Sequence, residues 1–281
     1  MTEPAITEKF IDSKDGTRLR TIAWAAPEEI KARVMFVHGW AEYADRYRFP
    51  ATWLTSKGYA CFGLDCRGHG GSAGKRGFIR SFDEYLDDVE MALDALPGDN
   101  DRTFLVGHSQ GGLVCARLLE QRGDLGLAGL VLSSPFLRLA RELSAVEKFM
   151  SRKLSKLFPG LRIPSGLDVS DISKDEEVVR AYAVDPLIFR KPVVRWAAAV
   201  LDAQQAVLED AGKIEIANLT MHGADDKIAH PETTRAFFEG VASEDKTLKL
   251  YEGLRHEIFN EIERDTVFAD VEAWLDARCL G

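Results

Sequence analysis

The stretch Thr103-Phe104-Leu105-Val106-Gly107-His108-Ser109-Gln110-Gly111-Gly112 decides the fold of this chain. Its first four residues form a short run typical of a strand buried on both faces of a parallel sheet. The residues that follow, from about 111 to 122, have the apolar spacing of a helix. The two glycines of the pattern Gly-x-Ser-x-Gly let strand and helix pack closely around a strained residue. The stretch therefore predicts a sharp strand-turn-helix junction that lifts the Ser109 hydroxyl clear of a sheet.

Similar units surround this junction along the chain. Short apolar runs predict further strands of the same sheet at 34–37, 59–64, 130–132, 216–221 and 247–251. Helical patterns follow most of them, at about 50–57, 82–95, 231–239 and 264–277. Residues 10–22, with the turn Asp15-Gly16, predict a hairpin at the sheet edge. We therefore predict an α/β fold: a mostly parallel, doubly wound sheet with an antiparallel N-terminal edge.

The alternation of strand-like and helix-like patterns ends after Pro135. Residues 136–212 carry only helical patterns and loops, which predicts a helical cap inserted after the sixth strand. The core would then comprise residues 1–135 and 213–281. Within the cap, the basic amphipathic stretch 149–158 is interpreted as a lid helix, with weak contact to a membrane surface as the alternative.

Composition and charge exclude several classes of protein. The chain has 281 residues, 46% of them hydrophobic and 29% charged, which suits one large core. Its net charge of -9 repels phosphate backbones, so we expect no nucleic-acid partner. No apolar run approaches the roughly 20 residues of a membrane-spanning helix, and no signal peptide is evident, so a cytoplasmic location is expected.

The cysteines predict neither a disulfide framework nor a metal site. They are scattered, without a Cys-x-x-Cys pair or a histidine at zinc-ligand spacing, at positions Cys61, Cys66, Cys115 and Cys279. We expect these cysteines to act as small apolar side chains that fill space in the core. No cofactor is expected either, because catalysis by an activated serine needs none.

A second segment, Gly70-Gly71-Ser72-Ala73-Gly74, also fits the pattern Gly-x-Ser-x-Gly. It follows the polar segment 65–69 and precedes Lys75-Arg76-Gly77, so no strand enters it and no helix leaves. We interpret it as a turn within a loop. The context of the motif, rather than the motif itself, selects Ser109 as the candidate nucleophile.

A serine hydroxyl is a weak nucleophile and needs a base, and the base needs a carboxylate that holds it in the right tautomer. In this kind of fold the order along the chain is serine, acid, histidine. The doublet Asp225-Asp226 follows one returning strand and His256 follows the next, where open α/β sheets keep their sites. The other histidines are interpreted as loop, packing or helix-start residues: His38, His69, His108, His222 and His230.

Negative charge that develops on a carbonyl oxygen needs preorganised donors. The backbone N–H after the nucleophile, that of Gln110, is the first candidate, and that of Trp40 after the third strand is the second.

Four segments together resemble the monoacylglycerol lipase and lysophospholipase branch of the α/β-hydrolases, the serine aminopeptidase S33 type. They are residues 38–42 with Arg46-Tyr47, residues 65–77, residues 107–112 and residues 253–257. In that family the acid follows Gly-x-x-Asp, which selects Asp226 over Asp225. The resemblance implies that the cap is a lid over an apolar site. This chain departs from the family at Gln110, where methionine is common, and at Trp40, where a small residue is common.

The resemblance implies a serine carboxylic-ester hydrolase that acts on a lipid-like ester, such as a monoacylglycerol or lysophospholipid, through an acyl-enzyme intermediate. A broad short-chain carboxylesterase and a catalytically silent small-molecule-binding protein are the alternatives. Dehalogenases and epoxide hydrolases of this fold carry aspartate at the elbow, and Ser109 argues against them.

Overall fold

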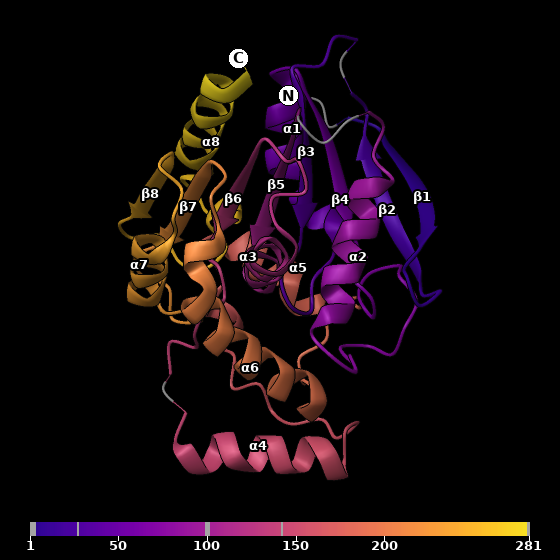
Figure 1. The fold of residues 1–281 in the computed structure, drawn as a ribbon, viewed down its shortest axis with the longest axis vertical. Coiled ribbons are helices and arrows are strands. Elements are labelled where there is room, and N and C mark those ends of the chain that lie inside the picture. Colours follow the sequence, from indigo (N-terminus) through magenta and orange to yellow (C-terminus); the bar gives the residue numbers. More distant parts are fainter. Residues whose placement is uncertain (1–3, 27, 99–101, 142, 280–281) are drawn as a thin grey trace.

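The fold is built around one sheet, shown in Figure 1. The computed structural model describes residues 4–26, 28–98, 102–141 and 143–279. Its sheet has the strand order β1-β2-β4-β3-β5-β6-β7-β8. The strands are β1 (Ile6–Asp12), β2 (Arg18–Trp24), β3 (Ala32–Val37), β4 (Tyr59–Leu64), β5 (Thr103–His108), β6 (Gly129–Ser133), β7 (Asn218–Gly223) and β8 (Lys246–Tyr251).

The pairing of the strands confirms the predicted topology. β1 pairs with β2, and β2 with β4, in antiparallel fashion, whereas the remaining neighbours are parallel. The hairpin is longer than predicted, because its register continues outward to the pair Ile6 and Trp24. β7 lies two residues later than predicted, because its pairing with β8 continues to Gly223 and Tyr251.

Helices cover both faces of the sheet, as a doubly wound fold requires. They are α1 (Arg48–Ser56), α2 (Asp83–Asp94), α3 (Gln110–Arg122), α4 (Ala145–Leu157), α5 (Glu176–Val184), α6 (Val194–Asp210), α7 (Pro231–Gly240) and α8 (Arg264–Cys279). One apolar core contains Leu86 of α2, Leu113 of α3 and Phe237 of α7. The other contains Leu54 of α1 and Phe268 of α8.

The helices α4, α5 and α6 lie between β6 and β7, in the segment predicted to be inserted after the sixth strand. Figure 1 shows α6 between the core and α4, which lies at the far end of the molecule. The α6 side chains Trp196, Val200 and Val207 belong to the same apolar cluster as Leu113 of α3. This helix is therefore packed onto the core, and it carries α4 on its outer side. A boundary between core and cap at residues 135 and 213 stays a prediction.

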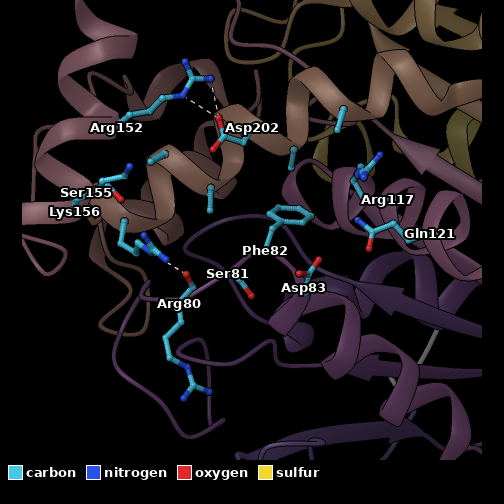
Figure 2. A pocket seen from close by; sticks show the side chains of 15 residues that line it. Arg80, Ser81, Phe82, Asp83, Arg117, Gln121, Arg152, Ser155, Lys156 and Asp202 are labelled. Carbon is cyan, nitrogen blue, oxygen red and sulfur yellow. Dashed lines mark hydrogen bonds and ion pairs between the residues drawn. The ribbon is translucent and has the colours of Figure 1, made fainter.

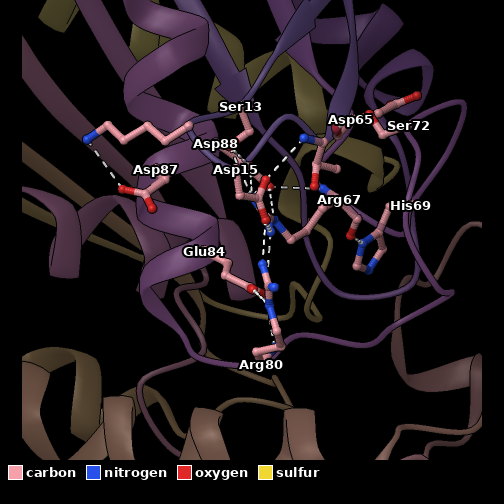
Figure 3. A network of polar contacts seen from close by, with 12 residues as sticks. Ser13, Asp15, Asp65, Arg67, His69, Ser72, Arg80, Glu84, Asp87 and Asp88 are labelled. Carbon is pink, nitrogen blue, oxygen red and sulfur yellow. Dashed lines mark hydrogen bonds and ion pairs between the residues drawn. The ribbon is translucent and has the colours of Figure 1, made fainter.

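Buried ion pairs fix the loop after β4, as Figure 3 shows. Arg67 donates to Asp88 through Nη2 at 2.6 Å and through Nε at 2.8 Å, and Ser13 donates to the same carboxylate at 2.7 Å. The Ser72 hydroxyl accepts the Arg20 backbone N–H at 2.7 Å and donates to the carbonyl of Asp65. The second Gly-x-Ser-x-Gly segment is thus a loop held by its own serine, as predicted.

Substitution of Arg67 by methionine is expected to lower the free energy of unfolding by about 3–5 kcal/mol, because Asp88 would then be a buried carboxylate without its cation. Arg80→Met is the matched control, since the Arg80 side chain is 67% exposed and such ion pairs contribute about 0–1 kcal/mol. Urea denaturation of both variants measures the difference. Equal stability of the two variants would contradict this account.

Candidate active site

Ser109 lies at the predicted junction, after the last residue of β5 and before the first residue of α3. Its backbone has φ 53° and ψ -119°, a strained conformation for a residue with a side chain. A Cβ atom on Gly107 would lie 2.6 Å from the carbonyl oxygen of Gly111, and one on Gly111 would lie 2.1 Å from that of Val37. Both glycines are therefore required for strand and helix to approach each other this closely.

The structure brings the three predicted side chains together at the carboxyl ends of the strands. Nε2 of His256 lies 2.8 Å from Oγ of Ser109, and Nδ1 of the same ring lies 2.6 Å from Oδ2 of Asp226. All three residues are buried. With the Nδ1 proton donated to the carboxylate, Nε2 is free to accept the proton of the serine hydroxyl. This is the hydrogen-bonding order that activates a serine.

The two residues of the Asp225-Asp226 doublet lie in different surroundings. Asp226 is buried and accepts the backbone N–H groups of Ile228 at 2.7 Å and Ala229 at 3.0 Å, in addition to its contact with His256. Asp225 is exposed, and its backbone N–H donates to the carbonyl of Leu254. Only Asp226 of the two contacts the histidine among the described residues.

A second histidine, His222, lies beside Asp226, and this contact was not predicted. Nε2 of His222, on β7, lies 2.9 Å from Oδ2 of Asp226, and its Nδ1 lies 2.8 Å from the hydroxyl of Thr234 on α7. The spacing of four residues between His222 and Asp226 was the available signal. Burial alone would raise the pKa of Asp226, but His256 and His222 outweigh it and hold that pKa well below its ordinary value.

The loops that carry Asp226 and His256 touch each other through Gly223. A Cβ atom on this glycine would lie 2.1 Å from the carbonyl oxygen of Arg255, so no larger residue fits there. The histidine loop is held further by Glu261, whose Oε1 accepts the backbone N–H of Arg255 at 2.8 Å. The separation of acid and base is therefore fixed by backbone contacts as well as by side chains.

Burial by itself lowers the pKa of His256, but the adjacent Asp226 carboxylate outweighs it, so this pKa lies above the ordinary value of 6.5. Because only the neutral imidazole accepts a proton, kcat/KM for a p-nitrophenyl ester is expected to fall as the pH drops through this raised pKa. In Asp226→Asn the residual activity should show its inflection at lower pH. A wild-type inflection below 6.5, or no shift in the variant, would contradict the assignment.

Two other buried histidines are placed differently. Burial lowers the pKa of His108 to about 3, with a further contribution from His256, and Nδ1 of His108 lies 3.1 Å from the Ser133 hydroxyl. Burial also lowers the pKa of His69 to about 3, and its Nδ1 bonds to the carbonyl of Arg67. Both were predicted to have local roles, and both make local contacts in the structure.

The two residues predicted to supply oxyanion donors belong to segments that adjoin Ser109. Gln110 is the first residue of α3, where a backbone N–H has no acceptor within its own helix. Trp40 follows Gly39, and a Cβ atom on Gly39 would lie 3.1 Å from Cβ of Ser109. The loop is held by Glu42, whose Oε1 accepts the N–H of Gly39 at 2.6 Å.

A cavity of about 590 Å³ opens over Ser109 and His256 and extends beneath the cap. Its wall combines Ile228 of the core with apolar residues of the predicted cap such as Phe136, Met150, Leu154 and Ile172. The cavity is mostly apolar away from the reacting side chains, which suits an acyl chain.

A second cleft, of about 480 Å³, lies between cap and core and is shown in Figure 2. Its wall is charged, and two of its arginines are paired with acidic residues: Arg152 donates to Asp202 at 2.8 Å and Arg117 to Asp210 at 2.8 Å. It contains none of the residues around Ser109. The substrate cavity is therefore the apolar one.

The described residues contain no group of three or more histidine, cysteine or acidic side chains that could hold a metal ion. Among the same residues, no helix combines the length and apolar character needed to cross a membrane. Cys61, Cys66 and Cys115 are buried and free, in agreement with a packing role.

A mostly parallel sheet with serine, acid and histidine in this order at its carboxyl edge defines the chain as an α/β-hydrolase. A family model described as serine aminopeptidase S33 matches residues 28–263. The chain belongs to this family.

Individual relatives agree with this assignment. The chain is 35% identical over 254 residues to Phospholipase YtpA of Bacillus subtilis, covering 90% of this chain and 98% of the relative. It is 33% identical over 264 residues to the monoacylglycerol lipase of Mycolicibacterium smegmatis, covering 92% and 93%. The crystal structure of Paleococcus ferrophilus monoacylglycerol lipase superimposes with a TM-score of 0.85 at 30% identity, covering 92% and 99%. The predicted likeness to the monoacylglycerol lipase and lysophospholipase branch, and a carboxylic-ester hydrolase activity, are thereby confirmed.

Proposed function

We propose that Ser109, His256 and Asp226 are the catalytic triad of a lipid-ester hydrolase whose substrates are monoacylglycerols or lysophospholipids. The observation that carries this proposal is the unbroken series of contacts from Asp226 through His256 to Ser109, at 2.6 and 2.8 Å, at the base of an apolar cavity. Contacts of this length lie within the range in which a base can remove a proton from its nucleophile.

The reaction follows from the positions of these groups. The Ser109 oxygen attacks the ester carbonyl while His256 accepts its proton, and Asp226 stabilises the imidazolium that forms. The backbone N–H groups of Trp40 and Gln110 donate to the oxyanion of the tetrahedral intermediate. His256 then gives the proton to the leaving alcohol, and an acyl-enzyme remains on Ser109. Water, activated by the same histidine, releases the fatty acid and restores the serine.

The apolar wall favours a long acyl chain over a short one. Apolar cap residues such as Leu154 and Ile172 line the same cavity as Ser109, and a long acyl chain can cover more of this apolar wall than a short one. Phospholipase and monoacylglycerol lipase are the names of two relatives at 33–35% identity. A broad short-chain carboxylesterase is the competing proposal, and it rests on Trp40 and Trp196, two large side chains in mutual contact that line the cavity together with Ser109.

Acyl-chain profiling separates these two proposals. With 1-monoacylglycerols of 4 to 16 carbons, kcat/KM is expected to rise by about tenfold or more from the shortest chain to the best one, because each buried methylene contributes about 0.8 kcal/mol. Lysophosphatidylcholine of the same chain length tests the head group. A steady decline of kcat/KM beyond four carbons would favour the short-chain esterase.

The cap is also proposed to touch membrane surfaces weakly through α4. Phe149 and Leu157 on this helix are 57% and 69% exposed, and Lys153 lies over the Phe149 ring at 5.5 Å. An exposed apolar strip flanked by cations is typical of helices that lie in a lipid interface. A location in the cytoplasm stays a prediction from the sequence.

Vesicle sedimentation tests this contact. Phe149→Ser combined with Leu157→Ser is expected to reduce binding to vesicles that contain phosphatidylglycerol by about tenfold. Full insertion of the two apolar side chains would contribute about 3–6 kcal/mol to the free energy of binding, and partial insertion contributes less. Ile262→Ser is the matched control, since Ile262 is 64% exposed outside the cap. Equal binding of the three proteins would contradict the proposal.

A further inference from the structure

Trp196, on the cap helix α6, contacts both residues whose backbone N–H groups are the proposed oxyanion donors. Its indole Nε1 donates to the side-chain Oε1 of Gln110 at 2.6 Å. Its ring lies 5.2 Å from the ring of Trp40, at an interplanar angle of 32°. Trp196 itself is only 7% exposed. One residue of the cap therefore joins the two sides of the site where negative charge would develop.

The two donors differ in how firmly the core holds them. The Gln110 backbone belongs to α3, which packs in the apolar core, and the residue is completely buried. Trp40 lies in the loop after β3, next to Ala41 with φ 67°. Its ring packs between cap residues, against Trp196 and, edge to face at 5.3 Å, against Phe189. The position of the second donor therefore depends on the cap far more than that of the first.

The Gln110 side chain is bonded to the cap through its carbonyl oxygen. This Oε1 accepts the indole N–H of Trp196, and the whole Gln110 side chain is buried. The bond is thus a direct link from the residue after the nucleophile to the cap. It also accounts for both departures from the family noted in the sequence, since Gln110 and Trp40 meet at the same cap residue.

We propose that Trp196 is a positioning residue that sets the separation of the two oxyanion donors, so that the oxyanion hole is complete only when α6 is docked on the core. Its hydrogen bond to Gln110 attaches α6 to the rigid donor. Its ring then holds the Trp40 loop at a fixed distance from that donor. This inference rests on the proposed function, because it assigns Trp196 a role in the same reaction.

The test removes this hydrogen bond from each side in turn. Trp196→Phe keeps an aromatic ring and loses the donor, and Gln110→Met keeps an unbranched side chain and loses the acceptor. For p-nitrophenyl butyrate each variant is expected to reduce kcat by about 5- to 20-fold with KM changed by less than about twofold, since complete loss of one oxyanion donor costs about 10²–10³. The double variant should be no slower than the slower single variant, because both substitutions remove the same contact.

A second readout separates positioning from packing. A trifluoromethyl ketone forms a bond between its carbonyl carbon and Oγ of Ser109, the hydroxyl proton passes to His256, and the carbonyl oxygen becomes an alkoxide in the oxyanion hole. The inhibition constant of this ketone should rise by the same factor as kcat falls. Dodecanol occupies the acyl cavity without forming an oxyanion, and its inhibition constant should stay within about twofold of the wild-type value.

Trp53→Phe is the matched control, because it also removes an indole hydrogen bond, that from Trp53 to Glu272 at 2.8 Å, and neither residue lines the cavity over Ser109. It should leave kcat and both inhibition constants unchanged. If Trp196→Phe does not fold, Gln110→Met still tests the same hydrogen bond, because it removes the acceptor on the core.

Unchanged kcat in Gln110→Met and Trp196→Phe, losses that multiply in the double variant, or dodecanol binding that weakens as much as ketone binding would overturn the inference. These results leave the proposed function intact, since wild-type activity that depends on Ser109 would remain. A Ser109→Ala variant with wild-type activity would instead overturn the proposed function itself.

Discussion

Ser109→Ala is expected to lower kcat for p-nitrophenyl butyrate by about 10⁶-fold, which leaves only the weak catalysis that an oxyanion hole and substrate binding supply without a nucleophile. The loss is this large because His256 and Asp226 act only through the serine oxygen, which His256 contacts at 2.8 Å. Steady-state kinetics of the highly purified Ser109→Ala protein measures the residual kcat. Removal of the hydroxyl should leave the fold unchanged, since no backbone group of the described residues depends on it.

Ser72→Ala is the informative comparison, because Ser72 fits the same five-residue motif. Its hydroxyl bonds to the Arg20 backbone N–H and to the Asp65 carbonyl, so its loss should reduce stability while kcat of the folded protein stays within about twofold. A large loss of kcat in Ser72→Ala with retention in Ser109→Ala would reverse the assignment of the nucleophile.

Asp226→Asn is expected to reduce kcat by about 10⁴-fold, the loss typical of a triad whose histidine is held in the wrong tautomer. An amide at this position can donate to Nδ1 of His256 and would then leave Nε2 protonated, unable to accept from Ser109. The backbone N–H groups of Ile228 and Ala229 would still find an acceptor in the amide oxygen. The steady-state rate above the pKa of His256 measures the effect without interference from protonation.

Asp225→Asn provides the matched control, since it makes the same chemical change one residue away on an exposed side chain. Its kcat should stay within about twofold of the wild-type value. Comparable losses in the two variants would contradict the assignment of Asp226 as the acid.

The sequence was sufficient for the fold and for the order of the reacting residues. Buried strands such as β5 and β6 are short apolar runs, and the elbow is recognisable because a strand enters it and a helix leaves it. The carboxyl ends of parallel strands meet at one edge, so residues after β7 and β8 were predicted to lie near Ser109. These features depend on local pattern and on topology, both of which the sequence carries directly.

Contacts between distant segments could not be predicted. Trp196 and Gln110 are 86 residues apart, and their hydrogen bond depends on how the cap docks on α3. Local patterns identify an amphipathic helix but do not fix its rotation or its position on a neighbouring helix. The same holds for the bond of Arg67 to Asp88, since a charged residue in a loop and one on a helix are normally expected to be exposed.

Labelling with a fluorophosphonate probe, followed by peptide mapping, tests the central claim most directly, because the reagent bonds to a serine only where a base and an oxyanion hole activate it. The account predicts a single modified peptide that carries the probe on Ser109, formed in the wild-type protein and absent after Ser109→Ala. An unlabelled wild-type protein, or a probe attached to Ser72 or any other serine, would contradict it.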